Sequence, residues 1–207
     1  MAISEVHPGQ TIAPNVVLDE KTELVTSTQE IVSPVGGDDA SFLVTSPYTE
    51  REHCLDLRSV DTENALLARA LVHMKSLRPD YATAPYTETF NWSEIMGELA
   101  GLLRETGHKW KETSFYIVAF RSQIPRRRSV ASGGFLKYWF GTPDKDGRNL
   151  ATCVWRSLHD ARAGGVGPAH RKAAGAARHL YTDWKIDRHR LTIRDELSSW
   201  EIVNWTD

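Results

Sequence analysis

The chain has 207 residues, of which 25 are basic and 27 are acidic, so its formal net charge is −2. This balance argues against a general nucleic-acid-binding protein, which needs a cationic surface to displace counterions from phosphates. Hydrophobic residues make up 41% and charged residues 25%, the proportions of a soluble globular protein with room for a core and a small-molecule cavity. The sequence shows neither a leader-like N-terminus nor eighteen consecutive apolar residues, so we expect a cytoplasmic protein without membrane contact.

The chain is expected to divide into an arm and one domain. Residues 1–40 mix proline, glycine and polar residues with short β-branched pairs, which indicates an extended or flexible N-terminal arm. Residues 41–207 are expected to form a single α+β domain. The two cysteines, Cys54 and Cys153, have no metal-binding spacing and are interpreted as small buried residues.

The first part of the domain carries an amphipathic helix. A short strand is predicted at His53–Arg58, where apolar and polar residues alternate. Asp61 can cap the helix that follows, and its apolar residues recur every three or four positions as far as Leu77. Pro79 is expected to end it.

A second helix is marked at both ends. The segment 81–90 is broken by proline and is predicted to be a loop or short strand. Asn91 and Glu94 have the spacing of a capping box, and Gly107 can supply a left-handed stop.

The second half alternates strands with helices. Strands are predicted at Phe115–Ser122, Ser132–Phe140, Leu150–Ser157, Lys185–Arg194 and Trp200–Trp205. Helices are predicted at His159–Gly165 and from Pro168 onward. This order favours an α+β fold with a ferredoxin-like antiparallel sheet and helices packed on one face. The other face must be covered by another part of the chain, as in an α+β barrel, or by a partner subunit in a homodimer.

Three segments of this half resemble a fungal protein family without an assigned activity. They are SGGFLKYWFG (132–141), NLATCVWRS (149–157) and GPAHRKA (167–173). The tryptophan strand and the helix after it also resemble dimeric α+β barrel proteins, which include monooxygenases, polyketide cyclases and haem-dependent dehydratases. The chain is shorter than the family pattern between Ser122 and Val130, a segment expected at a pocket entrance.

Aromatic residues crowd the second half, either as a large core or as the walls of a cavity. Under the cavity interpretation, Tyr138 is the expected hydrogen-bond donor to a substrate carbonyl. The expected substrate-binding residues are Tyr116, Phe120, Trp139, Trp155, Arg156 and Tyr181.

Arginines and a histidine offer further candidates. Arg121, at a strand end, could anchor a substrate carboxylate or enolate, as could Arg188 and Arg190. The alternative is that the strand arginines are solvent-exposed or pair with carboxylates such as Asp160 or Asp187. His170 could act as a general acid or base, or be a surface or capping histidine. No histidine pair has zinc-helix spacing, and we expect neither a metal nor a cofactor.

These residues, together with the resemblance, predict a cofactor-independent cyclase or isomerase of fungal secondary metabolism. A pericyclase such as a Diels–Alderase needs only a shaped apolar cavity and a polarising donor. The expected substrate is a small apolar terpenoid or polyketide. The alternatives are a cofactorless or haem-dependent monooxygenase or dehydratase, and a small-molecule-binding protein without catalytic activity.

Overall fold

The computed structural model describes residues 40–123, 136–165 and 181–206. The expected N-terminal arm, the helix expected from Pro168 and the candidate residue His170 lie outside these ranges.

Helix α1 (Thr62–Leu71) begins where the sequence predicts but ends earlier than predicted. The side chain of Asn91 binds the backbone that follows α1. Its Oδ1 accepts a hydrogen bond from Lys75 N at 2.9 Å, and its Nδ2 donates one to His73 O at 3.1 Å. These bonds replace helical ones, so the prediction that the helix continues to Leu77 is wrong.

Helix α3 (Trp92–Thr106) has the predicted ends. Gly107 follows it with φ 66°, the left-handed conformation that glycine adopts without steric cost. Asn91 occupies the N-cap position, but its side chain donates to Glu94 Oε2 instead of capping a backbone amide. The short helix α2 (Tyr86–Thr89) lies in the segment predicted to be a loop or strand.

The segment predicted as a strand at His53–Arg58 is mostly turns. Two short strands, β1 (Phe42–Leu43) and β2 (Leu55–Asp56), pair antiparallel. Single-turn helices at Arg51–His53 and Leu57–Ser59 flank β2. The Asp56 carboxylate accepts hydrogen bonds from the backbone and guanidinium of Arg58, which folds the chain out of the strand.

Five antiparallel strands form the main sheet, in the spatial order β4-β5-β3-β6-β7. They are β3 (Thr113–Gln123), β4 (Lys137–Phe140), β5 (Arg148–Trp155), β6 (Asp183–Ile193) and β7 (Trp200–Asn204). The first four strands of this sheet along the chain, β3 to β6, lie in the order β6-β3-β5-β4, which is the ferredoxin-like arrangement 4-1-3-2. The α+β fold class expected from the sequence is confirmed.

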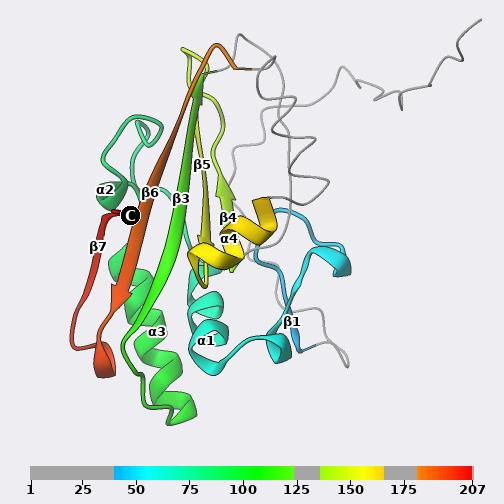
Figure 1. The fold of residues 1–207 in the computed structure, drawn as a ribbon, viewed down its shortest axis with the longest axis vertical. Coiled ribbons are helices and arrows are strands. Elements are labelled where there is room, and N and C mark those ends of the chain that lie inside the picture. The colour runs from blue at the N-terminus through cyan, green and yellow to red at the C-terminus, as the bar shows by residue number, and fades with distance from the viewer. Residues whose placement is uncertain (1–39, 124–135, 166–180, 207) are drawn as a thin grey trace, which may run out of the picture. The chain divides into compact units, whose positions relative to one another are not determined.

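The sheet carries helices on both faces (Figure 1). Helices α1 and α3 pack on one face, which we call the helix face, where Phe115, Ile117 and Leu191 join their apolar residues in one buried core. Helix α4 (Leu158–Gly165), in the connection from β5 to β6, lies on the opposite face. Helix α4 therefore covers part of the second face of the sheet, and a homodimer that covers the rest stays a prediction.

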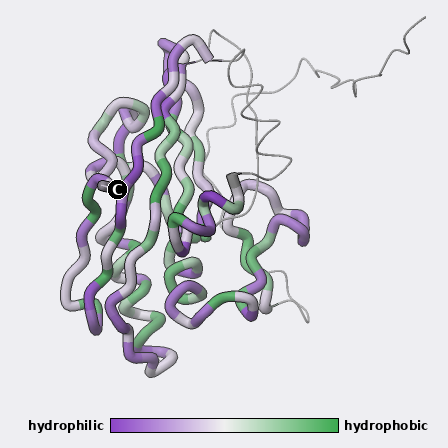
Figure 2. Tube along the Cα trace, viewed as in Figure 1, coloured by the Kyte–Doolittle hydropathy of each residue, from purple (hydrophilic) through white to green (hydrophobic). Residues whose placement is uncertain are grey.

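Hydrophobic residues are concentrated where the sheet meets α1. Figure 2 shows them along the middle of β3 and β5, while the far ends of the long strands are hydrophilic. Strand burial follows the alternation expected from the sequence, since Phe115, Ile117 and Ala119 are fully buried. In the described part of the chain, no helix has the length and apolar character needed to cross a bilayer.

Candidate functional site: an aromatic face of the sheet

The face of the sheet opposite α1 and α3 carries most of the predicted site residues, and we call it the aromatic face. Strand alternation places Tyr116 and Phe120 of β3 on this side. The register pairs Tyr116 with Trp155, so the indole lies beside the phenol. It also pairs Tyr138 of β4 with Cys153, which puts Tyr138 on the same side. Four predicted residues from three strands are therefore brought together on one face.

The rings form two groups along this face. Near α4, Tyr116 meets Trp205 edge to face, with ring centroids 4.9 Å apart. Toward the other end of the sheet, Phe120 lies between Tyr181 and Trp184, with centroids 5.2 and 5.9 Å away. The predicted residue Tyr181 thus joins the face through Phe120.

Helix α4 sits directly on the Trp155 indole. A Cβ atom placed on Gly164 would lie 2.5 Å from the ring, so only glycine allows this approach. The helix begins with a closed polar cluster: Ser157 Oγ and Arg156 Nη2 both donate to the Asp160 carboxylate, at 2.7 and 2.8 Å. Arg156, predicted to bind substrate, is therefore paired with Asp160, the alternative that the sequence left open.

The part of the face around Phe120 is more exposed. Trp184 is 49%, Ile186 43% and Phe140 40% exposed. By register, Phe140, Ala151, Phe120 and Ile186 form one row across four strands. An exposed apolar row of this kind on an otherwise well-packed domain suits contact with an apolar ligand.

Burial keeps three titratable side chains of the aromatic face, those of Tyr138, Tyr181 and Cys153, in their neutral forms. Burial raises the pKa of the Tyr138 phenol well above its usual value, and raises that of Tyr181 in the same direction. Burial also raises the pKa of the Cys153 thiol to about 12. At physiological pH these groups can donate hydrogen bonds, but none is a ready base or thiolate nucleophile.

Arg121, also predicted as a site residue, does not lie on the aromatic face. Its side chain lies on the helix face, where Nε donates to Asp187 Oδ2 at 2.9 Å. The other guanidinium nitrogens donate to the carbonyl oxygens of Tyr81, Ala82 and Ala84 at 2.7 to 3.2 Å. Arg121 therefore fastens the segment before α2 to the sheet, and the expectation that it anchors a substrate is replaced by this structural role.

Trp139 is also separated from the predicted group. It alternates with Tyr138 along β4, is 8% exposed and belongs to the core under α1. Its ring contacts Tyr81 and Phe90 edge to face, with centroids 5.4 and 4.9 Å away. The expectation that Tyr138 and Trp139 line one cavity fails because adjacent residues of a strand point to opposite faces.

The helix face holds a buried polar group that the site prediction missed. His189 stacks on Tyr86, with ring centroids 4.6 Å apart, and the Tyr86 hydroxyl is 2.8 Å from Thr152 Oγ1. Burial lowers the pKa of His189, and its Nε2 has no hydrogen-bond partner among the described residues. The alternation of His189 with Leu191 and Ile193 along β6 was the available signal that this side chain points inward.

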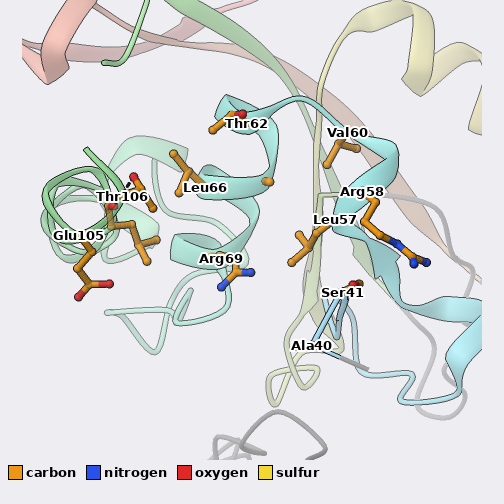
Figure 3. Close-up of a pocket in the computed structure, with 12 residues that line it drawn as sticks. Ala40, Ser41, Leu57, Arg58, Val60, Thr62, Leu66, Arg69, Glu105 and Thr106 are labelled. Carbon is orange, nitrogen blue, oxygen red and sulfur yellow. Dashed lines mark hydrogen bonds between the residues drawn. The ribbon is translucent and has the colours of Figure 1, made fainter. Parts of the chain in front are cut away.

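A separate groove of about 450 Å³ lies away from these residues. Figure 3 shows α1 side chains between those of α3 and those of the turn at 57–60. Its rim is charged: Arg69 and Glu105 line it, and Arg58 lines it while bound to Asp56. None of the predicted site residues that the structure describes borders this groove. In the described ranges, no cluster of histidine, cysteine and carboxylate side chains could hold a metal ion.

The strand order and the aromatic face define an α+β protein with a ferredoxin-like sheet. The chain belongs to the PB2B2.08-like family, whose model matches residues 44–130 and 126–204. It is 38% identical over 190 residues to UPF0643 protein PB2B2.08 of Schizosaccharomyces pombe, a match that takes in 78% of this chain and 84% of the relative. No solved structure matches the chain. The expected membership in a fungal family is confirmed, while the link to cyclases stays a prediction.

The matches also bear on the segment expected to be short. The two parts of the family match meet at residues 126–130. The alignment with the relative spans 190 positions, but it includes only 78% of the 207 residues of this chain, which is fewer than 190. The relative therefore has residues at some aligned positions where this chain has none. Neither observation locates the additional residues of the relative, so the shortened segment between Ser122 and Val130 stays a prediction.

Proposed function

We propose that the protein binds an apolar small molecule on the aromatic face and acts on it as a cofactor-independent cyclase or isomerase. The observation that carries the proposal is the sheet register, which gathers Tyr116, Phe120, Tyr138 and Trp155 on one face. Apolar ligands are bound by aromatic surfaces that carry a few polar groups. The floor between these rings consists of smaller residues, Val118, Ala151 and Cys153, all half-buried.

The chemistry follows from what these side chains can do when neutral. Tyr138 keeps its proton, because burial raises the pKa of its phenol, and can donate a hydrogen bond to a substrate carbonyl. A donor of this kind polarises the carbonyl, and the aromatic surface holds the reacting ends of the substrate close together. An intramolecular cyclisation such as a Diels–Alder reaction requires no more than this. The proposed substrate is a terpenoid or polyketide intermediate of fungal secondary metabolism, a class suggested by the resemblance.

One observation favours a second candidate, binding without turnover. One of the three residues expected to be catalytic, Arg121, donates its hydrogen bonds to Asp187 and to three backbone carbonyl groups instead of to a substrate. If Tyr138 alone polarises the ligand, the rate gain is small, and the protein acts as a carrier or sensor of an apolar molecule.

The experiment that separates the two candidates uses metabolite extracts from cells that lack the gene. Purified protein is incubated with the extract, and the products are followed by chromatography with mass detection. The proposal predicts a compound that changes retention time at unchanged mass, and a rate reduced by about tenfold or more in Tyr138→Phe. A change of mass would contradict a simple cyclisation, and retention of a bound compound without conversion would establish the binding protein.

We further propose that the protein acts in the cytoplasm. The low cysteine content and the lack of a disulfide between Cys54 and Cys153 suit a reducing compartment.

A further inference from the structure

Two arginines stand out on the aromatic face because neither forms an ion pair with any residue that the structure describes. Arg188 and Arg190 alternate along β6 with the inward-pointing residues Asp187 and His189, so both point to the aromatic side. Both are exposed, and neither guanidinium has an ion-pair or hydrogen-bond partner among the described residues. The other two strand arginines considered from the sequence, Arg121 and Arg156, are both paired with aspartates.

The neighbours of these two arginines are aromatic. The Arg190 guanidinium lies 5.9 Å from the centre of the Trp205 ring, a cation–π contact that holds the charge over the face. The register pairs Arg190 with Tyr116, and Arg188 with Val118. On β7, Glu201 lies on the same side of the sheet, but its carboxylate is bound by Arg194 at 2.9 Å. No described carboxylate on this face is therefore left to neutralise Arg188 and Arg190.

Building on the proposed function, we propose that the ligand of the aromatic face is an elongated apolar molecule with a carboxylate at one end. The carboxylate binds Arg188 and Arg190, whose planar guanidinium groups match its two oxygens. The apolar body lies over Val118 and Cys153 toward Tyr138, beside the row that contains Phe120 and Ile186.

The sheet sets the length of this ligand. Arg188, Val118, Cys153 and Tyr138 form one row across four neighbouring strands. Three strand spacings of about 4.8 Å separate the ends of the row by roughly 14 Å. A ligand whose carboxylate is on Arg188 and whose reacting carbonyl is at Tyr138 therefore has the length of a medium-chain polyketide or terpenoid acid.

The test compares a fluorescent fatty acid, cis-parinaric acid, with its methyl ester, below the concentration at which either aggregates. The acid and the ester share the apolar body and differ in the charge of the head. Wild-type protein is expected to bind the acid about tenfold more tightly, the effect of one charge-assisted hydrogen bond at a partly exposed site. In the double variant Arg188→Gln/Arg190→Gln the affinity for the acid should fall to that for the ester.

A matched control removes two charges elsewhere. Lys109 and Lys145 are exposed and lie away from the aromatic face, so Lys109→Gln/Lys145→Gln should keep the preference for the acid. Loss of that preference in the control, or its persistence in Arg188→Gln/Arg190→Gln, would overturn the proposal and leave the proposed function standing. If wild-type protein binds neither probe, the proposed function fails with it. Binding of the acid only within anionic vesicles would identify a membrane surface as the partner and also overturn the proposal.

Discussion

The Arg121 guanidinium binds the Asp187 carboxylate at 2.9 Å across the neighbouring strands β3 and β6. Its remaining nitrogens reach the carbonyl oxygens of Tyr81, Ala82 and Ala84. Both charged side chains are largely buried, at 17% and 20% exposure. One arginine therefore joins two strands to the segment that leads into α2, which positions Tyr86 over the sheet.

Arg121→Ala should destabilise the protein by roughly 2–3 kcal/mol, because it leaves a largely buried carboxylate and three carbonyl groups with fewer partners. Arg156→Ala is the matched control. Its ion pair with Asp160 is more exposed, so its loss should cost less than about 1 kcal/mol. Chemical denaturation of both variants measures the difference. Unchanged stability of Arg121→Ala together with loss of ligand binding would restore Arg121 as a functional residue.

Lys137 should make the protein more stable as the pH rises. Its Nζ donates to Val72 O at the end of α1, and burial lowers its pKa from 10.5 to about 8. Between these two values the unfolded chain binds a proton that the folded protein does not, so the free energy of unfolding increases with pH. The gain between pH 7 and pH 10.5 should be on the order of 3 kcal/mol.

Lys137→Met should remove this gain, because methionine fills the same space without a charge. The measurement is the unfolding free energy at several pH values. Lys145→Met, at an exposed position of the β4–β5 turn, should behave like wild type. An equal rise of stability with pH in Lys137→Met would show that another group is responsible.

His189 should make the protein less stable in mild acid. Burial lowers its pKa below 6.5, with the nearby cations Arg121 and Lys185 acting in the same direction and Asp187 opposing them. As the pH falls below 6.5, the unfolded chain takes up a proton before the folded protein does, so stability is lost. His189→Phe keeps a ring stacked on Tyr86 but cannot titrate, and its stability should fall less between pH 7 and pH 5. Parallel curves for the two proteins would contradict this assignment.

Two glycines of the α3 region should respond oppositely to substitution. Neither Gly97 nor Gly107 has an atom within 4 Å of an added Cβ, so only the backbone decides. Gly97→Ala, inside the helix, should stabilise the protein by about 0.5–1 kcal/mol. Gly107→Ala should destabilise it by about 1 kcal/mol, because its φ of 66° suits glycine. Thermal unfolding of both variants gives the two signs directly.

The fold could be predicted from the sequence wherever one local rule decided it. Alternation in β3 and the left-handed stop at Gly107 both act over a few residues, and both are found as expected. The early end of α1 depends on Asn91, a residue twenty positions beyond Leu71, whose side chain binds the backbone after the helix. A local pattern carries no information about such a contact.

The candidate site was predictable in part for the same reason. The residues of the aromatic face were recognisable as aromatic strand residues, but their grouping depends on the register between strands. Treating Tyr138 and Trp139 as one wall neglected the alternation of β4. The pairing of Arg121 with Asp187 instead of a ligand depends on β3 and β6 being neighbours, which is known only once the sheet order is known.

The central claim is that the aromatic face binds an apolar molecule, and binding of the neutral dye Nile red tests it most directly. Trp184 and Ile186 are exposed on this face, so Trp184→Ala/Ile186→Ala should stay folded and bind the dye about tenfold more weakly than wild type. Leu77→Ala, which removes an apolar side chain that is 57% exposed outside this face, should bind as wild type does. Equal affinity in all three proteins would contradict the account.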